Sequence, residues 1–458
     1  MTNQADNKVG SNAAYTAELC LSPKPMTIPE SKLAGKRAGM VVFSSYPADP
    51  RPRRAAEALL KAGMTIDLIC EAEEKLPKKE RLGALDITRI PIRHFRGGVI
   101  AYAYQYASFI AWSAAIFAWR MPRRRYDLVY VHNMPDILVL SALLPKLFGA
   151  KVILDQHDPM PELMTTIFGM ADTSVAVRIM RLLEKWSFRC ADLVITVNEA
   201  CRKIFSARSC RAEKIAVIMN CPDPEIFPSR AAEYYPPSAP EAPFVVMYHG
   251  SLVERNGLDL AVEAVARIVK SIPNLELRVY GRSTPYLEEV MVKVRTLKLE
   301  NNVRYLGARK LEDLVREIES CNVGVIPNQR NTFTEINTPT RIFEYLALGK
   351  PVIAPRTPGI TDYFSSDSLL FFESGNPNDL ANAIEYVASH AAETTVIAER
   401  GHQVYLKHTW DKERTTLVNL VAGLVCKDAS DFSAAGRQGN DGAPIAVITS
   451  VEPNDLRR

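Results

Sequence analysis

The sequence lacks the close-set cysteine pairs that bind structural zinc. Its eight cysteines are scattered along the chain, and none forms a Cys-x-x-Cys pair. Scattered cysteines in a long chain fit a reducing compartment better than a disulfide framework. We therefore expect a cytoplasmic protein. Because zinc-finger spacing and other nucleic-acid motifs are also missing, we expect no nucleic-acid partner.

The beginning of the sequence lacks the apolar core of a signal peptide. Residues 1–35 are polar, and the last 32 residues, from Lys427, are rich in Gly, Ala, Ser and Asp. Such segments cannot bury enough apolar surface to fold. We expect residues 1–35 and 427–458 to be disordered.

Positive charge is unevenly distributed. Residues 36–125 contain 17 Lys or Arg and 8 Asp or Glu, a surplus of 9, whereas the whole chain carries only +4. The remainder is therefore net acidic. A local basic surplus favours an anionic partner, such as phosphates or a membrane surface.

Apolar strands alternate with helical segments in two blocks. In the first block we predict strands at 38–46, 64–70, 126–132, 150–158 and 191–198, with helices between them. In the second block we predict strands at 244–251, 275–281, 303–307 and 322–327, again separated by helices. This alternation is typical of α/β domains in which helices cover both faces of a parallel sheet.

A proline-rich linker separates the two blocks. Residues 228–243 contain five prolines, a composition typical of linkers. We therefore predict an N-terminal Rossmann-like domain at 36–227 and a second at 244–408. The helix predicted within 409–426 could pack back on the first domain. Ligands of such sheets bind at the carboxyl ends of the strands, so we expect a site in a crevice between the domains.

A helix start near residue 338 suits a phosphate. We predict a helix over 339–348, with Thr338 as N-cap and Gly349 at its end. Its free N–H groups and Arg341 favour an anion. Glu344, one turn further, could accept two hydroxyls of a ribose. A surface ion pair between Arg341 and Glu344 is the alternative.

Two strand ends carry further polar candidates. The turn "YHGSLVERNG" places Gly250 and Arg255 before a helix, where Arg could clamp phosphate oxygens. An ordinary turn with an exposed Arg is the alternative. The segment "DQHDPMPE" places His157 at a strand end, where it could contact a sugar hydroxyl. A structural histidine is the alternative. Candidates for acceptor binding nearby are His132, Asp158 and Glu162.

These motifs together resemble the retaining GT-B glycosyltransferases of family 4. The segments that carry the resemblance are "TPTRIFEYLALGKPVIA", "YHGSLVERNG", "DQHDPMPE", "VIMNCPDPEIF" and "YGRS", and it covers about residues 38–424. The resemblance implies a GT-B fold of two facing Rossmann-like domains, a nucleotide-diphosphate sugar as donor and no cofactor. It also implies catalytic roles for His157, Arg255 and Glu344.

The resemblance also implies the donor-binding residues. Glu344 would bind the ribose, Arg255 the diphosphate, and the loop at 307–310 would lie near the base. The sequence departs from the family at Ile336, where most members have a second Glu. The implied donor-binding residues are Gly250, Arg255, Gly281, Arg282, Gly307, Arg309, Asn337, Thr338, Arg341 and Glu344.

The resemblance implies a retaining transfer without a metal ion. Positive charge near the diphosphate would stabilise the leaving group, and no Asp-x-Asp motif precedes a plausible site. Two other functions stay open. A GT-B sugar-nucleotide 2-epimerase would use a similar donor site, and a degenerate GT-B module could serve as a membrane scaffold.

The longest uncharged stretch is residues 97–119. As a helix it would be about 35 Å long, enough to span a bilayer, but arginines flank it on both sides, up to Arg125. In-plane attachment to an anionic membrane, a helix buried in the domain, and a true span all stay open. In-plane attachment through residues 97–125 favours a peripheral protein on the inner face of the plasma membrane. The acceptor would then be a glycan or a polyprenyl-linked sugar, as in bacterial surface polysaccharide biosynthesis.

Overall fold

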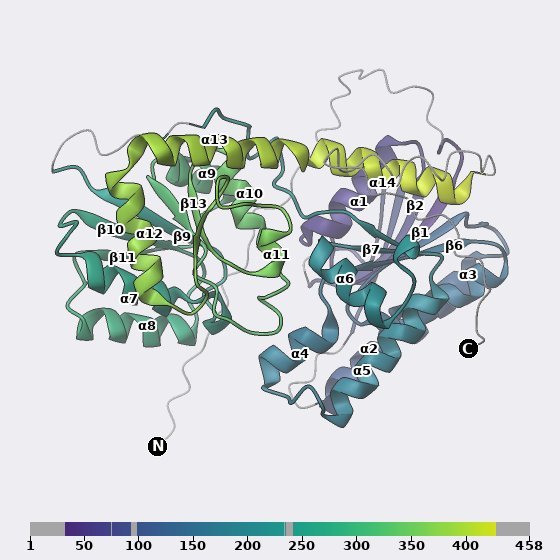
Figure 1. Ribbon diagram of the computed structural model, residues 1–458. Helices are drawn as coiled ribbons and strands as arrows, with labels where there is room; N and C mark the ends of the chain where they lie inside the picture. Colours follow the sequence, from purple (N-terminus) through teal and green to yellow (C-terminus); the bar gives the residue numbers. More distant parts are fainter. Residues whose placement is uncertain (1–32, 75, 93–98, 233, 235–240, 427–458) are drawn as a thin grey trace, which may run out of the picture.

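Two α/β domains lie side by side, joined by the linker and by a pair of long helices (Figure 1). The computed structural model describes residues 33–74, 76–92, 99–232, 234 and 241–426. The segments predicted to be disordered, 1–35 and 427–458, lie almost entirely outside the described residues. Leu33 is an exception, because it is fully buried in the N-terminal core. The first domain therefore begins slightly before residue 36.

The N-terminal domain is built on an eight-stranded sheet of order β3-β4-β2-β1-β5-β6-β7-β8. Only β3 runs antiparallel to its neighbour among these strands. The strands are β1 (Arg37–Ser45), β2 (Thr65–Glu71), β3 (Lys79–Leu82), β4 (Leu85–Ile90), β5 (Leu128–His132), β6 (Lys151–Gln156), β7 (Leu193–Thr196) and β8 (Ile215–Val217). Residues 38, 40 and 42 of β1 face one apolar cluster and Val41 faces another, so both faces of the sheet are covered.

Helices cover both faces of this sheet. Pro50 and Pro52 lie in the first turn of α1, and Asp49 caps the helix by accepting a hydrogen bond from the Arg51 N–H. The helices are α1 (Pro50–Lys61), α2 (Val99–Arg120), η1 (Asp136–Ala142), α3 (Leu143–Leu147), α4 (Met160–Phe168), α5 (Val175–Cys190), α6 (Glu199–Arg208) and η2 (Ala212–Lys214).

Arg51 lies between the two prolines that begin α1. Unlike its proline neighbours it has a backbone N–H, which bonds to Asp49, and its side chain turns into the domain, where it contacts Asp155. The start of α1 thus supplies a guanidinium at the carboxyl ends of β1 and β6.

The C-terminal domain repeats the architecture on a smaller, wholly parallel sheet. Its order is β11-β10-β9-β12-β13-β14. The strands are β9 (Phe244–His249), β10 (Leu275–Tyr280), β11 (Val303–Gly307), β12 (Val323–Val325), β13 (Val352–Pro355) and β14 (Leu370–Phe372). The helices are η3 (Glu254–Asn256), α7 (Leu258–Ile268), α8 (Pro285–Thr296), α9 (Leu311–Glu319), α10 (Thr340–Ala347), α11 (Pro358–Thr361), α12 (Pro377–Ser389) and α13 (Ala391–Lys407).

The last helix, α14 (Trp410–Val425), crosses back to the first domain. It follows α13 almost in line along one edge of the molecule and packs against α1 (Figure 1). Leu417, Val421 and Ala422 are buried in the N-terminal core, and the Glu413 carboxylate accepts a hydrogen bond from the Met219 N–H at 3.0 Å. Helix α14 is therefore part of the first domain's packing.

The predicted fold class is confirmed, because two doubly wound, Rossmann-like sheets are present. The sequence did not predict the β3–β4 hairpin. The helix predicted between the strands at 126–132 and 150–158 is a 3₁₀ helix followed by the short α3. The described part of the linker packs on the second domain. The Tyr234 hydroxyl donates a hydrogen bond to the Val387 carbonyl at 2.8 Å.

The uncharged stretch at 97–119 contains α2, and residues 97 and 98 lie outside the described residues. One face of α2 packs into the first domain through Phe109 and Phe117, which are fully buried. The other face exposes Tyr104, Trp112 and Trp119. Among the described helices, none is both long and apolar enough to span a membrane.

We predict that Leu417→Ala destabilises the protein by about 2–5 kcal/mol, because it leaves a cavity where α14 meets the N-terminal core. Urea unfolding followed by circular dichroism measures this loss. Asn419→Ala, at an exposed position of the same helix, is the control and should change the free energy of unfolding by less than about 0.5 kcal/mol. Equal effects of the two substitutions would contradict the packing of α14.

Candidate active site at the domain interface

The first half of the site is a buried ion pair at the carboxyl end of β6. The Arg51 guanidinium donates to the Asp155 carboxylate at 2.6 and 3.0 Å, and to Asn220 Oδ1 and the Ile218 carbonyl. The Tyr130 hydroxyl donates to the other carboxylate oxygen at 2.9 Å. Burial would raise the pKa of Asp155, but Arg51 and the neighbouring histidines lower it to about 2. Asp155 is therefore ionised at neutral pH.

Two histidines lie next to this ion pair. His132 Nδ1 and His157 Nε2 are 3.0 Å apart and share a hydrogen bond. The His157 N–H donates to Asn133 Oδ1 at 2.7 Å, which fixes the backbone at the strand end. Burial lowers the pKa of His132 well below its usual range and that of His157 to about 4. Both imidazoles are therefore neutral, and His157, which is the less buried, can offer a ring nitrogen to a ligand.

The same three residues form a group with the geometry of metal ligands. The ligand atoms of His132, Asp155 and His157 lie within 4.8 Å of one another. The Arg51 guanidinium, however, already occupies the Asp155 carboxylate. Its fixed positive charge opposes a cation at this place, so the arrangement fits a hydrogen-bonded cluster better than a metal site.

The second half of the site begins where β9, β10 and β11 end. Gly250 has φ +125°, and a Cβ atom at Gly281 would lie 2.3 Å from the Gly250 carbonyl oxygen. Only glycine allows the two strand ends to approach this closely. Gly307, at the end of β11, accepts a hydrogen bond from the Gly281 N–H at 3.1 Å. The three predicted glycines therefore lie together, with exposed Arg282 and Arg309 beside them.

Arg341 ties α10 to the end of β9. Its guanidinium donates to the His249 carbonyl at 2.7 Å and to Asn328 Oδ1 at 3.2 Å, and lies over the Tyr248 ring. The interpretation of an ion pair between Arg341 and Glu344 is not supported, because the two side chains do not form one in the described structure. Arg341 therefore positions the helix start and supplies positive charge there.

The prediction of Thr338 as the N-cap was wrong. The helix begins at Thr340 with Pro339 as its N-cap, and the Thr338 hydroxyl donates to the Gly359 carbonyl at 2.5 Å. The Ile342 N–H bonds to the Pro339 carbonyl. Within the described structure, the N–H groups of Thr340 and Arg341 have no acceptor. These two groups are therefore available to an anion.

Glu344 lies beneath this helix start, next to His249. Its Oε2 is 3.4 Å from His249 Nε2, and only 17% of its side chain is exposed. Burial raises the pKa of Glu344 to about 7, against the opposing charges of Arg341 and Arg54. Burial lowers the pKa of His249 to about 3, so this imidazole is neutral. Glu344 is a carboxyl without a cationic partner in contact, ready to accept or donate hydrogen bonds.

Electrostatic contacts bring the two halves together. Arg255, on η3 of the second domain, lowers the pKa of Asp158 on the first, although burial raises that pKa overall. Arg54, on the first domain, acts in the same way on Glu344. The Arg255 guanidinium makes no hydrogen bond or ion pair with any described residue. An arginine without a described partner thus lies near Asp158, the residue that follows His157.

The segment before α10 packs against the first domain. Ile336 is buried against the N-terminal apolar cluster that contains Phe205, and its carbonyl accepts a hydrogen bond from Asn198 Nδ2 at 2.8 Å. The same Asn198 nitrogen contacts the Thr338 hydroxyl at 3.1 Å. Asn337 lies between these two contacts and is partly exposed. Ile336 therefore serves packing between the domains.

The residues predicted for the acceptor are placed at different depths. Asp158 lies at the interface near Arg255. His132 is fully buried behind His157, and the Glu162 carboxylate is held by Arg208, which also pairs with Glu184. His132 and Glu162 therefore lie under the surface that was predicted to bind the acceptor.

Sequence reasoning missed Arg51, Asp155, Tyr130 and Asn198. The available signal was the arginine-rich segment "PRPRR" directly after β1 and the aspartate that ends the apolar run "VILD". An acid at the end of a buried strand needs a basic partner, and α1 starts at the same edge of the sheet.

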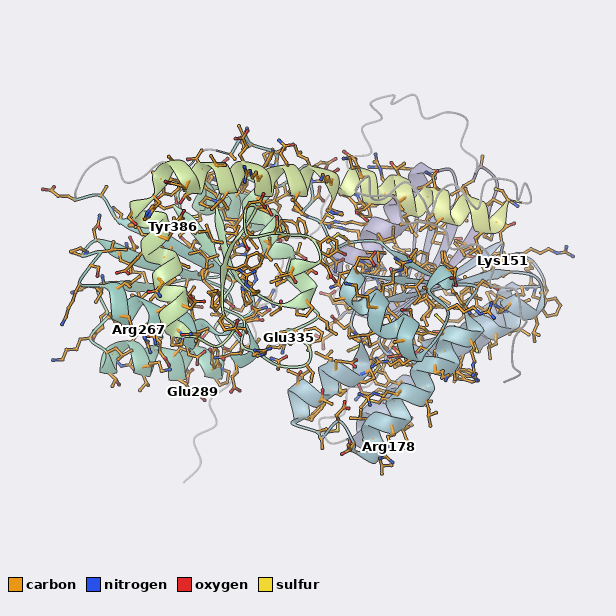
Figure 2. The ribbon with its side chains drawn as sticks, viewed as in Figure 1. Lys151, Arg178, Arg267, Glu289, Glu335 and Tyr386 are labelled. Carbon is orange, nitrogen blue, oxygen red and sulfur yellow. The ribbon has the colours of Figure 1, made fainter. Side chains whose placement is uncertain are left out.

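Another hollow lies away from this site. A groove between α7 and α8 is lined in part by Glu263, Arg267, Glu289 and Lys293. Figure 2 shows Arg267 and Glu289 at the outer edge of the second domain, whereas Glu335 lies on the side that faces the first domain. Lys293 is already paired with Glu263 at 2.5 Å, so the groove's charges are largely satisfied.

Comparison with known proteins follows the same division into two domains. A family profile described as "Glycosyl transferase 4-like domain" matches residues 48–221. A second, described as "Glycosyl transferases group 1", matches residues 243–390. Both matches support a GT-B glycosyltransferase family for this chain.

One relative of this chain is named as a biosynthetic glycosyltransferase. The putative colanic acid biosynthesis glycosyltransferase WcaL of Escherichia coli (strain K12) is 23% identical over 181 residues, which are 39% of this chain and 43% of WcaL. This alignment thus spans less than half of that relative.

Solved structures share the GT-B fold at low sequence identity. Sucrose-phosphate synthase from Thermosynechococcus elongatus matches with a TM-score of 0.67 and 18% identity, over 85% of this chain and 99% of that one. Anabaena HepE in complex with UDP-glucose matches with a TM-score of 0.61 and 17% identity, over 84% and 99%.

The raised pKa of Glu344 predicts a stability cost that depends on pH. In the unfolded chain this carboxyl ionises near its ordinary pKa of 4.5, but in the folded protein only near 7. Stability is therefore lost as pH rises from about 4.5 to about 7, and the loss is constant above that. We expect Glu344→Gln to melt at a higher temperature than the wild type at about pH 8 and at a similar temperature near pH 4.

Differential scanning fluorimetry without nucleotide measures both melting curves. Glu385→Gln, at a partly exposed position of α12 that is remote from the site, controls for loss of one negative charge. A Glu344→Gln variant that is no more stable than the wild type at the higher pH would contradict the buried, uncompensated carboxyl.

Proposed function

We propose that the protein is a retaining glycosyltransferase that uses a nucleotide-diphosphate sugar. The observation that carries the proposal is the domain interface, where Asn198 bonds the segment that begins α10 and Arg255 lies near Asp158, next to His157. Support comes from the GT-B family matches and from HepE, a structural neighbour solved with UDP-glucose. The acceptor would be a glycan or a polyprenyl-linked sugar.

The second domain offers a complementary surface for the donor. A diphosphate would accept hydrogen bonds from the N–H groups of Thr340 and Arg341 and from the free Arg255 guanidinium. Glu344, one turn into α10, would accept hydrogen bonds from two neighbouring hydroxyls of the ribose. The closely packed glycines at 250, 281 and 307 would let the nucleotide approach the backbone. The base would then lie near Arg309.

The first domain would hold the donor sugar. His157 is neutral and anchored by His132, so it can hydrogen-bond a sugar hydroxyl without carrying a charge. In a retaining transfer the acceptor oxygen bonds to the anomeric carbon on the face from which the diphosphate leaves. The C–O bond to the diphosphate breaks, and the acceptor's proton passes to a leaving phosphate oxygen. Arg255 and the α10 start would stabilise the negative charge on that phosphate.

We also propose that the reaction needs no metal ion, since arginine and helix N–H groups supply positive charge at the diphosphate. We place the reaction at the cytoplasmic face of the plasma membrane, in polysaccharide biosynthesis. Residues 97–125 would contact the anionic surface through the exposed aromatic side chains of α2 and through Arg123 and Arg125. Arg120 and Arg124 are instead bonded to Thr88, Asp67 and Asp86 within the domain.

A thermal-shift screen against UDP-, GDP- and ADP-sugars tests donor binding. We expect one of them to raise the melting temperature, since ligand at about 100 times its Kd adds about 2.7 kcal/mol. Arg255→Ala and Glu344→Ala should each weaken binding of that sugar nucleotide at least about tenfold.

The control is Arg295→Ala, an exposed arginine on α8, which should bind the donor as the wild type does. A protein that no sugar nucleotide stabilises would favour the degenerate scaffold. Slow interconversion of the donor without an acceptor would favour the 2-epimerase.

Product stereochemistry tests the retaining mechanism. Proton NMR of the product should show the anomeric configuration of the donor sugar, and the rate should persist in excess EDTA. His157→Ala should lower kcat by about 10²-fold or more while the donor-induced thermal shift remains. An inverted product would rule out the retaining mechanism, and a rate abolished by EDTA and restored by Mg²⁺ would rule out the metal-free one.

A further inference from the structure

The helix α5 turns an apolar face toward solvent. Residues three or four positions apart in a helix share a face, and this spacing connects the large apolar side chains of α5 that are exposed. They are Val175, Ile179, Leu182, Leu183 and Trp186. Val175 and Leu182 are 72% and 66% exposed. A solvent-facing stripe of this kind is the reverse of what a surface helix usually shows.

The opposite face of α5 is the one that packs on the domain, and half of it is polar. Its buried residues are Val177, Glu184, Ser187 and Phe188. The Glu184 carboxylate is fully buried and is bonded to the Arg208 guanidinium at 2.5 and 2.9 Å. This ion pair fixes the rotation of α5, so the apolar stripe cannot turn inward without breaking it.

The end of α4 also exposes apolar side chains. Ile167 and Phe168 are 48% and 62% exposed, and α4 packs against α5. Figure 1 shows the two helices projecting together from the lower edge of the first domain. We refer to residues 160–190 as the α4–α5 hairpin. Together the two helices expose seven large apolar side chains, more than the single exposed side chains common on soluble proteins.

Positive charge flanks the stripe. Arg178, Lys185 and Arg189 are exposed on α5, and within the described structure none of their side chains has an acidic partner. Figure 2 shows Arg178 at the outer tip of the first domain. The other charges of the helix are neutralised, because Arg181 pairs with Asp172 and Glu184 with Arg208. The stripe therefore has a basic rim and no free acidic side chain on α5.

We propose that the α4–α5 hairpin docks on an anionic lipid bilayer. The apolar stripe enters the boundary between headgroups and acyl chains, and the basic rim contacts lipid phosphates. A second copy of the chain fits this surface less well, since symmetric pairing would bring two basic rims together. The residues of this surface differ from residues 97–125, which were proposed above to contact the membrane. Helices α2 and α5 nevertheless belong to the same domain, since both pack against η1.

The hairpin lies close to the candidate active site. Residues 157–159 connect β6 to α4, so His157 and the hairpin are adjacent in the chain. Thr165 of α4 contacts Thr332 of the second domain at 3.0 Å between hydroxyl oxygens. A docked hairpin would hold the domain interface beside the bilayer. The inference that the acceptor is lipid-linked rests on the proposed function, whereas the docking itself does not.

Sedimentation with lipid vesicles tests the docking on the full chain. We expect binding to phosphatidylcholine vesicles with roughly a quarter phosphatidylglycerol and much weaker binding to phosphatidylcholine alone. Leu182→Ser/Trp186→Ser and Arg178→Gln/Lys185→Gln/Arg189→Gln should each weaken binding at least about tenfold. Only the charge variant should lose the sensitivity of binding to added salt.

Matched variants separate this surface from others. Val292→Ser/Leu311→Ser removes exposed apolar side chains from the second domain and should bind as the wild type does. Trp112→Ser/Trp119→Ser tests α2. Unchanged melting temperatures, and an unchanged shift with the donor, would show that each variant is folded. Donor binding that fails while vesicle binding persists would defeat the proposed function and leave the docking intact.

Trp186 gives a second readout. In a Trp112→Phe/Trp119→Phe/Trp410→Phe background, which leaves Trp186 as the one tryptophan, bromine-labelled lipid should quench its fluorescence. No vesicle binding by the wild type, equal binding by Leu182→Ser/Trp186→Ser, or a loss confined to the α2 variant would each overturn the proposal. The proposal would also be overturned if the wild type formed a dimer but bound no vesicles, and if Leu182→Ser/Trp186→Ser dissociated that dimer.

Discussion

The buried ion pair between Arg51 and Asp155 organises the first half of the site. It joins the start of α1 to the end of β6 and reaches the segment after β8 through Ile218 and Asn220. A carboxylate this deeply buried is stable only with such a partner. Because Asp155 stays ionised, the Tyr130 hydroxyl has a fixed acceptor. His132 Nδ1 lies 3.5 Å from the same carboxylate and shares a hydrogen bond with His157, which is held at the interface in turn.

In the second half of the site, by contrast, charged side chains lack partners. Arg255 has no described partner and Glu344 has no cation in contact, so both keep their bonding capacity. Interactions left unmade in the free protein are available to a ligand. The charged residues of the first domain thus bond to one another and form a rigid support. In the second domain, Arg255 and Glu344 have no charged partner in contact. This difference matches the roles proposed for them, holding a sugar and binding a nucleotide diphosphate.

The sequence predicted the two sheets because buried parallel strands are long apolar runs separated by amphipathic helices. It placed Gly250, Arg255, Arg341 and Glu344 near one another for the same reason, since strand ends meet at one edge. It did not pair Arg51 with Asp155, because the two are 104 positions apart. The arginine-rich segment and the strand-end aspartate mark each residue separately but do not show that they meet. The prediction of Thr338 as N-cap was wrong because the Thr338 hydroxyl donates a hydrogen bond to the Gly359 carbonyl, which is distant in the sequence.

The return of α14 to the first domain affects how the chain is made. Leu417, Val421 and Ala422 complete the N-terminal core, yet the ribosome synthesises them after every strand of the second domain. Domains generally fold as units during synthesis, with the N-terminal one first. Here the face of α1 that α14 covers stays exposed until α14 has been synthesised. Because α14 follows the second domain in the chain, the first domain can complete its core only after the second domain has been synthesised.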